Sequence, residues 1–267
     1  LRRQRQMCIR DRYRQALPLL IKGLEKLEYR GYDSSGIAII NTKNSDLVCN
    51  KSAGKLKNLI SKVSNKKIIG TVGIGHTRWA THGKPIVKNA HPHLDTTGTV
   101  AVVQNGIIEN FQDLKTKLEN EGTIFQSDTD TEVIPNLIQR ELNNLSKLNL
   151  ENNGSTLLIA VRNVLSDLEG AYALAVLWSG APDSLVVARR QAPLIIGLGE
   201  GEFVCASDTP AIANFTKTIL PMEDEEIGLL TPLGIELYNS NNERQYRNPT
   251  SLKLSLIHIS EPTRLRR

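Results

Sequence analysis

The chain is poor in cysteine and aromatic residues, and it has no long apolar run. Only three of its 267 residues are cysteine (Cys8, Cys49 and Cys205), widely spaced and without a C-x-x-C pair. Neither a disulfide framework nor a cysteine-based zinc site is therefore indicated. No apolar stretch approaches the roughly 20 residues that a membrane-spanning helix needs, and the arginine-rich start does not resemble a secretory signal. These absences predict a cytoplasmic protein with no membrane partner.

Positive charge is concentrated at the two ends. The formal net charge is +5, which would suit a nucleic-acid-binding protein if the charge were spread over one face. Residues 1–12 carry +4 and residues 251–267 carry +3, which is more than the whole excess, so the remaining body is slightly acidic. Such a body offers no cationic surface to a phosphate backbone, so we expect no nucleic-acid partner.

The same two ends look foreign to the rest of the chain. Met7–Arg12 and Leu254–Ser260 can be encoded by the two strands of one DNA word, which resembles a transposon-derived sequencing adapter. We therefore predict adapter-like tails at 1–12 and, for the most part, at 251–267, around a body at 13–250. A body without its first strand would have unpaired backbone groups, so we expect an open core and marginal stability.

Apolar periodicity divides the body into helices and strands that do not alternate regularly. Helical spacing predicts helices within 17–27, 56–63, 111–118, 133–138 and 158–168. Runs rich in β-formers predict strands at 36–40, 47–49, 72–75, 99–103, 171–178, 185–188, 194–197, 202–206, 226–231 and 235–238. Residues 76–93 are predicted to form a polar loop. The pattern favours an α+β fold with antiparallel, helix-covered sheets over a doubly wound parallel sheet.

Four of the five histidines lie within residues 76–93. Imidazoles bind zinc, but these lack the i, i+4 spacing of a zinc hydrolase and have no adjacent cysteine or carboxylate, so we expect no metal. Arg78 offers a second interpretation, because a guanidinium can grip a carboxylate with two hydrogen bonds while the Thr81 hydroxyl completes the contact. A plain solvated loop is the alternative.

Two further motifs have both a structural and a chemical interpretation. Asn105-Gly106 follows a predicted strand, where it can form a simple turn or aim an amide and a backbone N–H at one point, as an oxyanion hole does. Residues 127–132 are polar and acidic and precede a predicted helix. Most of them should cap that helix, and a remaining carboxylate such as Asp130 could bind a substrate ammonium.

Taken together, these strings resemble the glutamine:fructose-6-phosphate aminotransferase family. Its order of motifs is found here at Leu27–Ser34, His76–Gly83, Asn89–His93, Gln104–Asn110, Ser127–Ile134, Gly170–Tyr172, Arg189–Gly197 and Ala206–Asp208. The resemblance covers about Tyr13 to Asn248. It implies the N-terminal-nucleophile (Ntn) hydrolase fold, a four-layer αββα arrangement with two antiparallel sheets.

The resemblance also implies roles for individual residues. Arg78, Thr81 and His82 would hold the carboxylate of glutamine, Asp130 its ammonium, and Asn105 with Gly106 the oxyanion. Trp79 would lie on a loop that closes over the site. His91 resembles a histidine near the tunnel towards the sugar site, and Arg30 one that supports the chain terminus. No cofactor and no metal are implied.

The nucleophile is where the sequence departs from the family. There it is a cysteine exposed as the first residue and followed by Gly-Ile and an apolar strand, and its own α-amine acts as the base. Cys8 is followed by Ile9-Arg10-Asp11 instead, without the glycine and with charges in place of apolar residues. We do not expect Cys8 to act as the nucleophile, because its thiol would be out of register with Asn105.

The implied parent enzyme hydrolyses glutamine to glutamate and passes ammonia to fructose 6-phosphate, making glucosamine 6-phosphate. Its isomerase domains are not in this chain, and we expect the parent to form a homo-oligomer and the chain as written to be inactive. Three alternatives stay open: the glutaminase half of a phosphoribosyl-type amidotransferase, a non-catalytic glutamine-binding scaffold, and a metal hydrolase. Cys-Gly-Ile ahead of Tyr13 in the intact gene would favour an enzyme over a scaffold.

Overall fold

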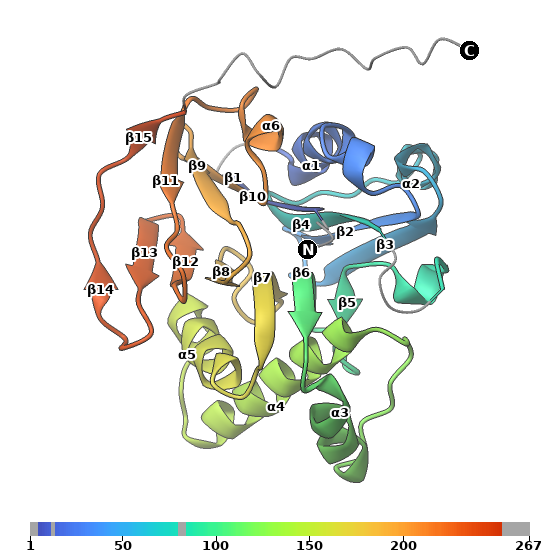
Figure 1. Ribbon diagram of the computed structural model, residues 1–267, viewed down its shortest axis with the longest axis vertical. Helices are drawn as coiled ribbons and strands as arrows, with labels where there is room; N and C mark the ends of the chain where they lie inside the picture. Colours follow the sequence, from blue (N-terminus) through green and yellow to red (C-terminus); the bar gives the residue numbers. More distant parts are fainter. Residues whose placement is uncertain (1–4, 12–13, 80–83, 253–267) are drawn as a thin grey trace.

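Two stacked antiparallel sheets form the centre of the molecule, and Figure 1 shows them together with their helices. The computed structural model describes residues 5–11, 14–79 and 84–252. The first sheet has the order β15-β11-β9-β10-β1-β4-β2-β3 and the second the order β14-β13-β12-β8-β7-β6-β5. All ladders between these strands are antiparallel. The predicted antiparallel α+β arrangement is therefore confirmed.

The strands vary from two to nine residues in length. Those of the first sheet are β1 (Arg5–Asp11), β2 (Ser34–Ile40), β3 (Leu47–Ala53), β4 (Val72–Arg78), β9 (Ile195–Leu198), β10 (Glu202–Ala206), β11 (Thr218–Pro221) and β15 (Thr250–Ser251). Those of the second are β5 (His93–Leu94), β6 (Val100–Ile108), β7 (Gly170–Trp178), β8 (Leu185–Arg190), β12 (Ile227–Thr231), β13 (Gly234–Tyr238) and β14 (Arg244–Gln245).

Helices cover the outer face of each sheet, and apolar side chains fill all three interfaces. The first sheet packs against α1 (Ala16–Glu25), α2 (Leu56–Val63) and α6 (Thr209–Ile212). The second packs against α3 (Phe111–Asn120), α4 (Val133–Lys147) and α5 (Gly154–Leu165). Short 3₁₀ helices lie at η1 (Glu28–Arg30), η2 (Val87–Asn89) and η3 (Asp130–Glu132). No helix among the described residues is long and apolar enough to cross a membrane.

The strand β1 lies in the middle of the first sheet, between β10 and β4. Met7 and Ile9 face α1, whereas Cys8 faces the space between the sheets, and all three are buried. This alternation lets an apolar Met-Cys-Ile run complete both interfaces. The expected open core is therefore wrong. The foreign origin of residues 1–12, and the boundaries drawn at 13 and 250, stay predictions.

Two further expectations about the chain's course are wrong. His76–Arg78 are not loop, because β4 continues to Arg78 and pairs with β2 through that residue. Likewise Asn105-Gly106 does not end its strand. The strand β6 continues to Ile108, because β7 supplies a pairing partner for each residue up to that point.

Candidate functional site

Strand alternation brings His76 and Arg78 of β4 and Asn105 of β6 into one space between the sheets. Ile74 and Val103, two residues earlier in each strand, belong to the apolar cluster that fills this interface. Because residues two apart share a face of a strand, the three polar side chains continue the same rows. A hydrogen bond of 3.0 Å between His76 Nε2 and Asn105 Oδ1 joins the two sheets there.

His76 fixes which way the amide of Asn105 points. Burial lowers the pKa of His76 to about 3, helped by the charge of Arg78, although the bond to Asn105 acts in the opposite direction. The imidazole is therefore neutral at pH 7, and Nε2 donates to an amide oxygen that can only accept. Within the described residues, Asn105 Nδ2 is buried without a hydrogen-bond partner. An amide donor is thus available to a ligand beside Gly106.

Arg78 places a buried positive charge in the same space. Its side chain is 1% exposed, and burial lowers the pKa of its guanidinium while the carboxylates of Asp33 and Asp130 oppose this shift. Asp130 begins η3, and its Oδ2 accepts a hydrogen bond of 2.9 Å from the Ile108 N–H. This bond ties the carboxylate to β6 two residues beyond Gly106. Arg78, Asn105 and Asp130 therefore converge.

A cation, a carboxylate and an amide donor around one space are complementary to a small zwitterion. A guanidinium suits an α-carboxylate, a carboxylate suits an ammonium, and an amide N–H suits a developing oxyanion. Trp79 follows Arg78 directly, is 41% exposed and packs edge-on to Tyr32 with ring centroids 5.2 Å apart. Thr81 and His82 lie outside the described residues.

The buried histidines form a packed chain that leads away from Asn105. The rings of His76 and His91 stack with centroids 4.2 Å apart, and His93 lies edge-on to His91 at 4.8 Å. The N–H of Gln104 donates to His91 Nδ1 over 3.3 Å, and His93 Nε2 lies 3.0 Å from the hydroxyl of Thr129. Among the described residues, no group of three potential ligands is placed to hold a metal ion. The tunnel role of His91 stays a prediction, as does the role of Arg30, the last residue of η1.

Because these histidines are buried and neutral, we expect the protein to lose stability on mild acidification. Burial is the largest cause that lowers the pKa values of His76, His91 and His93, with neighbouring positive charges adding to it. In the unfolded chain they take up protons near pH 6.5. Their contribution is therefore complete above that pH and is lost as the pH falls towards 3, by roughly 1.4 kcal/mol per pH unit for each histidine.

Urea unfolding followed by circular dichroism between pH 7.5 and 5 measures this loss. We expect the midpoint to fall steadily below pH 6.5, and His93→Gln to reduce the slope because it removes one such histidine. Carboxylates titrate mostly below this window, so they contribute little to it. A midpoint that does not change between pH 7 and pH 5 would contradict the buried neutral histidines.

The start of β1 adds one residue that sequence analysis missed. Gln6 lies opposite His76 in the β1–β4 ladder. It is fully buried, and both polar atoms of its amide lack a hydrogen-bond partner among the described residues. Gln6 was not predicted as a site residue because residues 1–12 were predicted to be a foreign tail. His76 was recognised only as part of a motif, although the alternation from Val72 to Arg78 already places it on the face that Arg78 shares.

Cys8 lies deeper in the same strand and faces the inter-sheet core. It pairs with Ile74 rather than His76, so it stands roughly 7 Å further from the site than Gln6. Its side chain is completely buried, and burial, followed by the proximity of Cys205, raises the pKa of its thiol well above the usual value. A nucleophilic cysteine needs a lowered pKa and access to substrate, and Cys8 has neither.

Comparison with known proteins is consistent with this geometry. The sequence model of a family described as "Glutamine amidotransferase domain" matches residues 76–214. The glutamine–fructose-6-phosphate aminotransferase (isomerizing) of Thermosynechococcus vestitus is 50% identical over 246 residues, 92% of this chain and 38% of that protein. The enzyme of the same name from Clostridium tetani is 45% identical over 247 residues, 92% of this chain and 37% of that protein. This chain thus spans about two fifths of such relatives.

Solved structures share the fold. The glutamine phosphoribosylpyrophosphate amidotransferase of Bacillus subtilis superposes with a TM-score of 0.73 and 28% identity, over 88% of this chain and 49% of that chain. The fold is accordingly that of the Ntn-type amidotransferases, as the resemblance implied. The chain belongs to the glutamine amidotransferase domain family. Within that family, eight relatives that match it at 44–52% identity carry the name glutamine–fructose-6-phosphate aminotransferase.

Proposed function

We propose that this chain is the glutamine-binding part of an enzyme that hydrolyses glutamine and transfers the released ammonia to fructose 6-phosphate, making glucosamine 6-phosphate. The observation that carries the proposal is the convergence of Arg78, Asn105 and Asp130 between the sheets. The proposal that fructose 6-phosphate accepts the ammonia is based on the names of relatives at 44–52% identity. The isomerase domains that would bind the sugar, a homo-oligomeric state and a cytoplasmic location are predictions that accompany this proposal.

Each converging group has one task. The guanidinium of Arg78 holds the α-carboxylate of glutamine with two hydrogen bonds, and Asp130 accepts from its α-ammonium. Attack on the side-chain amide turns its carbonyl oxygen into an oxyanion. Asn105 Nδ2 and the Gly106 N–H stabilise that charge. His76 acts through Asn105, because its donated hydrogen bond holds the amide oxygen away from the reacting carbonyl.

The nucleophile would have to stand at the beginning of β1, beside His76. Gln6 occupies that position, and an amide cannot attack a carbonyl in the way that a thiolate does. We therefore predict that the chain as written binds glutamine weakly and releases no glutamate. Isothermal titration with L-glutamine measures the binding, and an enzymatic glutamate assay measures turnover. Glutamate release that disappears in Cys8→Ala would contradict the predicted inactivity.

A phosphoribosyl-type enzyme is the second candidate, because its Bacillus subtilis representative shares the fold. Its identity to this chain is 28%, against 50% for the Thermosynechococcus vestitus sugar enzyme. Both candidates need the same glutamine site, so the binding experiment tests what they share. Because this chain is less similar to the phosphoribosyl-type enzyme than to the sugar enzyme, we favour the sugar enzyme.

A further inference from the structure

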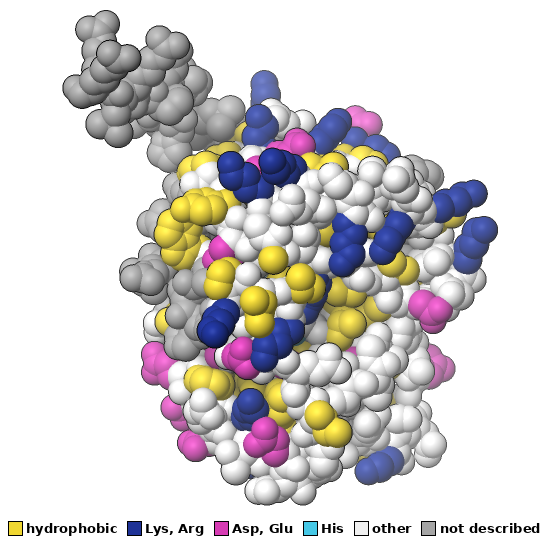
Figure 2. Space-filling model, turned by 90° about the vertical axis from the view of Figure 1, so that its right-hand side faces the viewer, with side chains coloured by type: hydrophobic (Ala, Val, Ile, Leu, Met, Phe, Trp, Pro, Cys, Tyr) yellow, Lys and Arg dark blue, Asp and Glu magenta, His cyan; other side chains and the backbone are white. Residues whose placement is uncertain are grey.

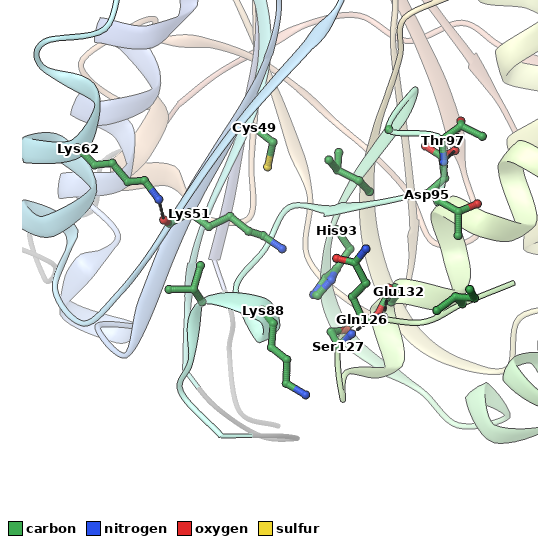
Figure 3. A pocket seen from close by; sticks show the side chains of 15 residues that line it. Cys49, Lys51, Lys62, Lys88, His93, Asp95, Thr97, Gln126, Ser127 and Glu132 are labelled. Carbon is green, nitrogen blue, oxygen red and sulfur yellow. Dashed lines mark hydrogen bonds between the residues drawn. The ribbon is translucent and has the colours of Figure 1, made fainter.

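A cavity of about 560 Å³ is lined by His93, the histidine of the packed chain that lies furthest from Asn105. It lies between β3 and α2 on one side and β5 and η3 on the other, as Figure 3 shows. Lys51, Lys62, Lys88, His93, Gln126 and Ser127 are among the residues that line it. Neither Arg78 nor Asn105 lines this cavity, so it is separate from the proposed glutamine site. Its volume lies in the range that small-molecule sites occupy.

Lys51 is the unusual group in this cavity. Its side chain extends from β3 across the cavity towards His93 (Figure 3). Burial lowers the pKa of its amine, although Cys49 and Glu132 oppose the shift. Throughout the part of the chain that the structure describes, its Nζ makes no hydrogen bond and no ion pair. A partly buried ammonium without an acceptor is costly, and a bound anion would offset that cost.

The carboxylates that line the cavity are already engaged by backbone groups. Glu132 accepts the N–H groups of Gln126 and Ser127 over 2.8 and 2.6 Å. Asp95 accepts those of Thr97, Thr99 and Val100 over 2.7–2.8 Å. Neither forms an ion pair with a lysine of the cavity in the described structure. Each carboxylate instead shapes the wall, and neither neutralises the charge of Lys51 through a direct ion pair.

Two more amines approach the same space. Lys62 Nζ donates to the backbone oxygen of Lys51 over 2.9 Å, which leaves two of its three N–H groups for other acceptors. Lys88 lies at the outer edge, paired with Asp128 at 2.8 Å. Positively charged side chains are spread over the surrounding face, which Figure 2 views directly. The wall of the cavity thus carries three lysines together with polar side chains such as Gln126 and Ser127.

We propose that this cavity binds a small phosphate monoester, with its phosphate between Lys51 and Lys62 and its body against Gln126 and Ser127. A dianion matches two ammonium groups better than a single carboxylate does, and lysine is a common phosphate ligand. Inorganic phosphate would fill only part of the cavity, whereas a phosphorylated polyol would also reach the amide and the hydroxyl. The site is independent of the proposed glutamine chemistry.

Isothermal titration with inorganic phosphate and with glucose 6-phosphate, at low and at raised sodium chloride, tests the proposal. Lys51→Gln should weaken glucose 6-phosphate binding by about tenfold or more, which is the loss of one charge-assisted contact. Lys57→Gln is the matched control, because Lys57 is an exposed lysine of α2 that does not line the cavity. It should bind as the unchanged chain does.

Lys51→Arg keeps the charge and should retain most of the binding, provided that circular dichroism shows both Lys51 variants folded. Glutamine binding should be the same in Lys51→Gln as in the unchanged chain, which separates this site from the glutamine site. Tighter binding of the sugar phosphate than of phosphate supports a phosphate monoester. No binding of either probe to folded protein, equal binding of the two probes, or equal weakening by Lys51→Gln and Lys57→Gln would overturn the proposal.

Discussion

Replacing Gly106 with alanine is expected to destabilise the fold by about 3 kcal/mol or more. Gly106 has a φ of +117°, a conformation that side-chain-bearing residues rarely adopt. An added Cβ would also lie 1.9 Å from the backbone oxygen of Ala171 in the neighbouring strand. Relief would require β6 and β7 to separate next to Asn105, so the longest ladder of the second sheet would weaken.

Urea unfolding of Gly106→Ala against the unchanged chain measures this loss. Gly98→Ala is the control, because Gly98 also has a positive φ, of +73°, but an added Cβ there meets nothing within 4 Å. It should cost about 1 kcal/mol. Equal losses for the two variants would show that the close approach at Gly106 has no energetic weight.

Arg78→Lys is expected to weaken glutamine binding by about tenfold or more, or about 1.4 kcal/mol. Lysine keeps the positive charge but cannot make the two parallel hydrogen bonds with which a guanidinium holds a carboxylate. Since Arg78 is 1% exposed, its shorter replacement would also leave space at the end of β4. Isothermal titration with L-glutamine, together with a thermal melt, separates the lost contact from lost stability.

Arg140→Lys is the matched control for that experiment. Arg140 lies on α4, where it pairs with Glu121 at 3.0 Å on the surface. This variant should bind glutamine as the unchanged chain does. If Arg78→Lys melts normally and binds glutamine without loss, the carboxylate of glutamine is held elsewhere and the proposed site is incorrect.

The helices were the most predictable part of the fold. In α4, Ile134, Leu137 and Ile138 recur at helical spacing and are buried against the second sheet. Such periodicity is local, and burying one face of a helix satisfies it wherever the helix docks. The strands were predicted where their apolar runs are long, as in β7. Short edge strands such as β5 and β14 were missed because two residues carry no period.

The errors arose where a neighbouring strand decided the outcome. Asn-Gly is a common turn dipeptide, but β7 pairs with β6 on both sides of Gly106 and holds it in the strand. His76–Arg78 were predicted to be loop because they are polar, and a strand that ends in polar residues has no apolar run to mark it. Their pairing with β2 holds them in the strand, where the side chains of the first and the last of them face a site between the two sheets. Residues 5–11 resemble a foreign tail in sequence, yet the alternating burial of Met7, Cys8 and Ile9 matches a central strand.

The sequence by itself determined the fold class, the helices and which residue types are available for chemistry, because these depend on local periodicity and on the motifs read directly from the chain. Only the tertiary structure decided that Arg78, Asn105 and Asp130 meet, that Gln6 rather than Cys8 lies beside them, and that Lys51 faces a separate cavity. These groups come from strands and a 3₁₀ helix far apart in the chain. Their distances depend on how two sheets stack and in which register β1 pairs, which no local pattern specifies.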